Sequence, residues 1–133
     1  YDHGSYYLPT VFEGLNNQTR LCREEIFGPV LALLPWQNED DLIAQCNDND
    51  YGLASGIWTR DYKTAWRLGR ALDTGTVWVN TYRAISYMMP FGGMKRSGLG
   101  RESGLEAVRH YLETKSTWIS YAEGVPANPF VMR

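Results

Sequence analysis

The fold of this chain is decided by Glu24-Glu25-Ile26-Phe27-Gly28-Pro29-Val30, where two carboxylates and an aromatic ring precede a Gly-Pro pair and an apolar run. Gly28 frees the backbone and Pro29 fixes its φ angle, so the turn has a defined shape. Such a turn presents Glu25 and Phe27 at the edge of the sheet that the following strand enters. A carboxylate can accept a hydrogen bond from a sugar hydroxyl, and an aromatic face beside it can pack against a flat ring. The alternative is a tight turn whose Phe27 fills the core and whose acids are solvated.

The segments after this turn alternate between strand and helix. Residues 30–35 are continuously apolar, as expected of a strand buried on both faces. Asn38 and Asp61 are N-cap residues that precede two helical stretches. Residues 53–58 and 76–80 then read as two further strands. Strand, helix, strand, helix, strand with short links predicts an α/β fold with a parallel βαβαβ core and right-handed crossovers.

The flanking segments are less regular. Residues 6–12 read as a strand that Pro9 restricts to an edge or a bulge, and residues 21–27 allow a short helical turn. Residues 104–111 predict a helix. The stretch from Thr114 to Tyr121 alternates polar with bulky side chains and predicts a strand with no obvious partner in the chain. The tail after it is not expected to form a compact element and would lie across another surface, such as a neighbouring subunit.

Composition is that of an ordinary globular protein. The chain has 133 residues, of which 44% are hydrophobic and 21% charged, and a net charge of -2. These values argue against disorder and predict one domain with its own core. There is no basic patch typical of a nucleic-acid partner and no membrane-surface pattern. The absence of a signal peptide and of a long apolar span indicates a soluble protein of the cytoplasm or an organelle matrix. The chain opens at Tyr1 rather than Met, which indicates a piece of a longer protein, a processed product or an incomplete start.

The residues that could serve as metal ligands or nucleophiles are scattered. Cys22 and Cys46 match no zinc or redox-dithiol spacing and have no neighbouring histidine, so they are interpreted as unpaired thiols. His3 and His110 are isolated from any serine or cysteine that they could activate. The sequence therefore predicts no metal site and no catalytic residue in this chain.

A long loop and a glycine-rich run follow the third predicted strand. Residues 81–93 are rich in Tyr, Met, Ile and Phe, and they start at the carboxyl end of a strand, where ligands of α/β sheets gather. Gly92-Gly93 and the glycines of residues 97–100 have the wrong spacing for a dinucleotide fingerprint or a P-loop. We expect these glycines to let two backbones pass close together.

Six motifs in one order resemble the carboxyl-terminal part of an aldehyde dehydrogenase, and the resemblance runs from about Tyr6 to Tyr121. The motifs are Pro9-Thr10-Val11-Phe12, Glu24-Glu25-Ile26-Phe27-Gly28-Pro29-Val30, Tyr51-Gly52-Leu53-Ala54, Gly75-Thr76-Val77-Trp78-Val79-Asn80, Pro90-Phe91-Gly92-Gly93 and Lys95-Arg96-Ser97-Gly98.

The resemblance implies a cofactor role for the Gly-Pro turn. The residue matching Glu25 holds the ribose hydroxyls on the nicotinamide side of NAD or NADP, and the residue matching Phe27 packs near that ring. Both roles fit the chemistry, because a carboxylate can accept two charge-assisted hydrogen bonds from hydroxyl groups. Asn80 matches a family position that supports the site from behind.

The resemblance also implies that the long loop contacts a small-molecule aldehyde. The family's channel-lining loop matches Tyr82, Arg83, Ile85 and Phe91. Arg83 could pair with an aldehyde that carries a carboxylate, or could point to solvent. Met88 and Met89 could be adaptable lining, but ordinary core is the preferred interpretation.

The resemblance divides the chain into two parts. Residues 1–112 match the carboxyl-terminal part of the catalytic domain, and residues 113–133 match the oligomerisation strand and tail. In the family this strand joins the sheet of a neighbouring subunit, which implies a homodimer or a homotetramer.

In the complete enzyme the resemblance implies that a thiolate attacks the aldehyde, a hydride passes to the cofactor, and water releases the acid. The family's nucleophile lies in a Gly-Gln-x-Cys context and its base in a glycine-rich motif, both upstream of the part matched here, as is the Rossmann-like half. The chain alone is therefore expected to be inactive. Two alternatives remain: a non-catalytic module that keeps the subunit-joining strand, and a different nucleotide-dependent oxidoreductase with a similar core.

Overall fold

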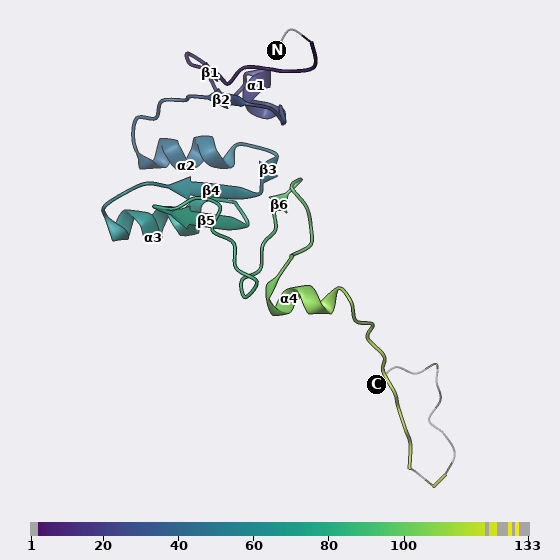
Figure 1. Cartoon of the computed structure of the whole chain (residues 1–133). Helices are drawn as coiled ribbons and strands as arrows, with labels where there is room; N and C mark the ends of the chain where they lie inside the picture. Colours follow the sequence, from purple (N-terminus) through teal and green to yellow (C-terminus); the bar gives the residue numbers. More distant parts are fainter. Residues whose placement is uncertain (1–2, 122, 125–127, 129, 131–133) are drawn as a thin grey trace.

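A computed structural model describes residues 3–121, 123–124, 128 and 130 as a mixed α/β chain (Figure 1). Its elements are β1 (Thr10–Phe12), α1 (Arg20–Arg23), β2 (Val30–Ala32), α2 (Glu39–Asn47), β3 (Tyr51–Gly52), β4 (Ala54–Ile57), α3 (Tyr62–Ala71), β5 (Thr76–Val79), β6 (Met94–Lys95) and α4 (Gly104–Arg109). No helix in these described ranges has the length and apolar character needed to cross a bilayer. Most of the predicted tail lies outside the described residues.

Three two-stranded ladders replace the single predicted sheet. β4 pairs with β5 in parallel, from Ala54 opposite Thr76 to Ile57 opposite Val79. β1 pairs with β2 in parallel, and β3 pairs with β6 in an antiparallel ladder that the sequence did not indicate. The parallel strands are confirmed, but the continuous βαβαβ sheet is not formed. No ladder joins β2 to β4 in the described chain, and α2 lies between the two parallel ladders (Figure 1).

Both predicted helix starts are confirmed by hydrogen bonds at the caps. The Asn38 Oδ1 atom accepts a bond of 3.0 Å from the amide of Asp41 at the start of α2. The Asp61 carboxylate accepts bonds of 3.1 Å from the amides of Lys63 and Thr64 at the start of α3. A hydrogen bond from the Thr64 hydroxyl, together with the bonds from these two amides, holds the pKa of the Asp61 carboxyl below its ordinary value. α3 then carries the chain from β4 back to the start of the parallel strand β5, which is the crossover connection that the sequence predicted.

The predicted core of a self-contained domain is largely missing. Ile57 and Leu68 are the buried apolar side chains among the described residues. The chain exposes 12110 Å², whereas a compact protein of 15.2 kDa exposes about 7,100 Å². The expectation that residues 30–35 are buried on both faces is also wrong for the described chain, because Leu31 is 55% exposed and Leu33 is 49% exposed. The elements therefore present open apolar faces rather than enclosing a core.

The glycine-rich segment crosses another part of the backbone, as the sequence predicted. A Cβ atom on Gly75 would lie 1.7 Å from the carbonyl oxygen of Gly92, and one on Gly92 would lie 2.4 Å from the carbonyl oxygen of Gly100. Only glycine fits at such distances. The loop that leaves the carboxyl end of β5 therefore returns to its amino end, next to Gly75.

We expect the 133 residues by themselves to bind an apolar dye such as anilinonaphthalene sulfonate and to unfold without a sharp thermal transition. The reason is the excess exposed surface, since small cores give little net stability. Dye fluorescence and calorimetry test this directly. A cooperative transition without dye binding would show that the chain is a complete domain.

Candidate functional site

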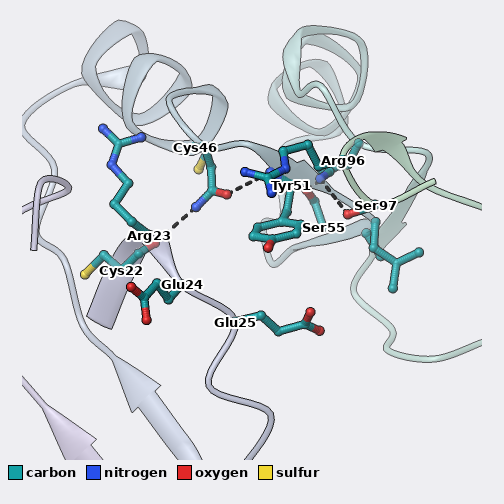
Figure 2. Close-up of a pocket in the computed structure, with 14 residues that line it drawn as sticks. Cys22, Arg23, Glu24, Glu25, Cys46, Tyr51, Ser55, Arg96 and Ser97 are labelled. Atoms are coloured by element: carbon teal, nitrogen blue, oxygen red, sulfur yellow. Dashed lines mark hydrogen bonds between the residues drawn. The ribbon is translucent and has the colours of Figure 1, made fainter. Parts of the chain in front are cut away.

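A cleft of about 550 Å³ opens between the end of α1 and the amino end of β4. The carboxyl end of α1 and the two residues after it form one wall with Cys22, Arg23, Glu24 and Glu25. Residues 51–55 form the other wall with Arg96 and Ser97. Figure 2 shows Glu25 on one side of the cleft and Tyr51, Arg96 and Ser97 on the other. The volume of this cleft lies within the range of small-molecule sites.

The wall that carries Glu25 is tied to the end of α2. Arg23 Nη2 donates to Asp48 Oδ2 at 2.6 Å, and Arg23 Nη1 donates to the Asp48 carbonyl at 2.6 Å. Asn49 Nδ2 donates to the Cys22 carbonyl at 3.1 Å, and its Oδ1 accepts from the Tyr51 amide at 2.9 Å (Figure 2). These bonds bring the chain into position just before Glu25.

The opposite wall is held by the segment around β6. The Gly52 amide donates to the Ser97 hydroxyl at 3.0 Å, and the Arg96 guanidinium lies 5.9 Å from the centre of the Tyr51 ring. Lys95 Nζ donates to the carbonyls of Asn47 at 2.7 Å and Asn49 at 3.2 Å, and so caps the carboxyl end of α2. Sequence reasoning missed this clamp, although a lysine within a glycine-rich turn was a visible signal.

The two predicted cofactor residues occupy different surroundings. Glu25 is exposed on the cleft, and its carboxylate accepts no hydrogen bond from the described residues. Phe27 lies outside the cleft lining and is 93% exposed, so the alternative that it fills the core is wrong. Its φ angle of 53° is a left-handed conformation that is strained for a bulky side chain. Strain of this kind clusters at functional sites, so the turn stays a candidate, with its ring available to pack against a partner.

The predicted substrate loop starts from a clamped asparagine. Asn80 Oδ1 accepts from the Thr59 amide at 3.0 Å and Asn80 Nδ2 donates to the Thr59 carbonyl at 2.8 Å, which extends the β4–β5 ladder by one side chain. Asn80 and Arg83 have φ angles of 52° and 56°, so both bends of the loop are left-handed. The clamp fixes Asn80 at the start of the loop, and the supporting role of this residue stays a prediction.

The rest of this loop faces outward. Tyr82, Arg83 and Ile85 are exposed, and Arg83 makes no ion pair with the described residues, so both alternatives for that arginine stay open. Met88 and Met89 are also exposed, so their interpretation as ordinary core is wrong. The surface that would bury them is not supplied by the described residues.

The structure does not bring all the predicted residues together. Asn80, Tyr82, Arg83 and Ile85 lie at the carboxyl end of the β4–β5 ladder, whereas Glu25 lies at the amino end. Phe91 returns to the amino end as well, where its amide and carbonyl exchange bonds of 2.7 Å with Glu102. The candidate cofactor residues and the candidate loop therefore belong to opposite ends of the same strands.

The cysteines do not look like nucleophiles. Cys22 and Cys46 are both free thiols that line the cleft. Burial raises the pKa of the Cys46 thiol, which disfavours the reactive thiolate. Both thiols are unpaired, as the sequence predicted.

Comparison with known proteins gives consistent matches. The model of the aldehyde dehydrogenase family matches residues 1–117. A putative aldehyde dehydrogenase, DhaS, of Bacillus subtilis is 43% identical over 120 residues, which cover 90% of this chain and 24% of that protein. Fluoroacetaldehyde dehydrogenase of Streptantibioticus cattleyicolor is 48% identical over 124 residues, covering 92% of this chain and 24% of that protein.

Solved structures agree with these relatives. The crystal structure of a Mycobacterium tuberculosis aldehyde dehydrogenase complexed with NAD+ superposes with a TM-score of 0.79 at 44% identity, covering 88% of this chain and 24% of that chain. The chain thus spans about a quarter of the length of the proteins that it matches.

The pairing of Asp48 with Arg23 makes a pH-dependent prediction. Bonds from Arg23 hold the pKa of the Asp48 carboxyl below its ordinary value, which is about 3.9. A depressed carboxyl pKa contributes stability that is complete above the ordinary value and is lost as the pH falls through the lowered one. We therefore expect carboxyl NMR to give a low pKa for Asp48, and Arg23→Gln to raise it toward the ordinary value, with the bonds from Asn17 and Gln18 still lowering it. An identical Asp48 pKa in the wild type and in Arg23→Gln would contradict the pairing of Asp48 with Arg23.

Proposed function

This chain belongs to the aldehyde dehydrogenase family, and we propose that it forms the carboxyl-terminal quarter of an enzyme that oxidises an aldehyde to a carboxylic acid with NAD or NADP. The observation that carries the proposal is the placement of Glu25, a carboxylate that pairs with none of the described residues and lies on a cleft of ligand size. The NAD+ complex among the structural neighbours supports NAD as the cofactor.

Glu25 fits the role of a ribose anchor. Its carboxylate faces an open cleft. The chain just before it is fixed by the bonds of Arg23 to Asp48 and by the bond of Asn49 to the Cys22 carbonyl. Two sugar hydroxyls can donate to one carboxylate, and such charge-assisted bonds are roughly twice as strong as neutral ones. When bound, the cofactor supplies the hydride acceptor; the chain supplies the orientation. The strained, exposed ring of Phe27 would pack near the nicotinamide.

The aldehyde would approach from the other end of the ladder. Tyr82, Arg83 and Ile85 are exposed there on a loop whose start is fixed by Asn80. In this proposal the loop walls the substrate channel at the carboxyl end of the ladder, and Phe91 lines the part of the channel that reaches the amino end. Neither Cys22 nor Cys46 has the family's nucleophile context, so the bond-making groups come from outside these residues and the chain alone does not turn over.

Glu25→Gln in the full-length enzyme tests the cofactor role. The substitution keeps the shape but replaces charge-assisted bonds by neutral ones, a loss of roughly 1.5 kcal/mol or about tenfold in rate. We expect single-turnover hydride transfer, followed by absorbance of the reduced cofactor, to slow by this factor.

Glu106→Gln is the matched control for this experiment. Glu106 lies on α4, pairs with Arg109 at 3.4 Å and does not line the cleft, so its variant should transfer hydride at the wild-type rate. An unchanged rate in Glu25→Gln, or equal losses in both variants, would refute the ribose role of Glu25.

We also propose that residues 114–121 join subunits into a homodimer or homotetramer. After α4 this segment runs away from the other elements (Figure 1). Trp118 is 95% exposed, and Ile119 and Tyr121 are exposed as well. Residues 114–121 form no strand within the described chain, so the predicted strand stays a proposal. Alternation of polar with bulky side chains suits addition to the edge of a partner's sheet.

Two adjacent prolines test the joining segment. In a strand, successive amides point to opposite edges, so replacing both Thr117 and Trp118 by proline removes the donor toward a partner in either register. We expect the native mass of the full-length protein to fall to that of a smaller assembly. The double variant Thr117→Ala, Trp118→Phe should keep the native mass, and a proline variant with unchanged mass would exclude this segment as the joint.

A further inference from the structure

One tryptophan of β5 faces the substrate loop rather than the helix layer. Val77 and Val79 line a hollow with Tyr62 and Trp66 of α3. Because side chains alternate along a strand, Trp78 projects to the opposite face of the ladder. The loop that begins at Asn80 folds back over that face.

Trp78 makes two different contacts with the loop. Its indole Nε1 atom donates a hydrogen bond of 2.8 Å to the Ala84 carbonyl. Its ring meets Tyr82 edge to face, with centroids 5.6 Å apart and planes inclined by 73°. One side chain therefore holds the loop on both sides of Arg83, the residue with the left-handed bend.

No other hydrogen bond fixes the tip of this loop within the described chain. The loop is anchored before the tip by the Asn80 clamp on Thr59. After the tip, the Tyr87 carbonyl accepts a bond of 2.9 Å from the Gly104 amide. Within the described chain, residues 81–85 make one hydrogen bond, and it is the bond from Trp78 to the Ala84 carbonyl.

We propose that Trp78 is a positioning residue that latches the loop and thereby sets which aldehydes are accepted. The inference rests on the proposed function, in which Tyr82 and Ile85 wall the channel. Trp78 itself does not touch the substrate in this scheme. Its hydrogen bond and ring contact hold Tyr82 and Ile85 at fixed places and offset the unfavourable backbone at Arg83, since a left-handed non-glycine residue persists only when its surroundings enforce it.

Trp78→Phe in the full-length enzyme removes the N–H donor and keeps an aromatic ring near Tyr82. Two aldehydes of different size, acetaldehyde and benzaldehyde, serve as probes. We expect the ratio of their kcat/KM values to change about two- to tenfold, the effect of one neutral hydrogen bond, mainly through the aldehyde KM. The KM for NAD should not change, because the cofactor cleft lies at the other end of the ladder.

Trp66→Phe is the matched control, since Trp66 is an exposed tryptophan on α3 at the face of β5 away from the loop. It should leave the ratio of the two aldehydes and both KM values as in the wild type. Equal behaviour of the two variants, or a loss in Trp78→Phe that is the same for both aldehydes and for NAD, would overturn the assignment.

A second measurement does not depend on activity. Trypsin cleaves after arginine, and Arg83 lies at the loop tip, next to the residue whose carbonyl Trp78 holds. Under native conditions we expect cleavage after Arg83 to be several-fold faster in Trp78→Phe than in Trp66→Phe. Equal cleavage rates would refute the latch even in an enzyme with full activity. A wild-type protein that oxidises no aldehyde but shows the difference in cleavage would instead refute the proposed function and leave the latch standing.

Discussion

The parallel pairing of β4 with β5 is the constraint on which the rest of the structure depends. At its carboxyl end the ladder is prolonged by the side chain of Asn80, which bonds both the amide and the carbonyl of Thr59. At its amino end Gly75 allows the returning backbone to pass at Gly92, where any Cβ atom would collide. The ladder therefore separates two regions of different character: a cleft with a carboxylate at one end, and a loop rich in aromatic and apolar side chains at the other.

Directional polar contacts, rather than a core, hold the cleft in shape. Two apolar side chains are buried in the described chain, whereas Arg23, Asn49 and Lys95 each bond backbone groups near the end of α2 or the start of β3. Such bonds fix orientation, but each contributes only about 1 kcal/mol net. Hydrophobic burial supplies most of the free energy of folding. The open faces of this chain are therefore consistent with a quarter of a larger protein whose other elements cover them.

Sequence patterns predicted the features that local chemistry determines. The caps at Asn38 and Asp61, the parallel strands on either side of α3 and the close crossing at Gly92 all follow from side-chain type and spacing. The continuous sheet was wrong because the neighbour of β2 depends on pairing between distant residues. The burial of Met88 and the core-filling alternative for Phe27 failed because the surfaces that would cover them are not in the described chain. The latch by Trp78 was missed because a tryptophan within a strand resembles ordinary core, although the aromatic loop just after it was a usable signal.

The most direct test of the whole account is a crystal structure of the full-length enzyme with its nicotinamide cofactor bound. The account predicts both hydroxyls of the nicotinamide ribose within hydrogen-bond distance, about 2.5 to 3.0 Å, of the Glu25 carboxylate, with the loop after Asn80 facing the reactive ring from the other side. A ribose held by other residues, with Glu25 directed to solvent, would contradict it.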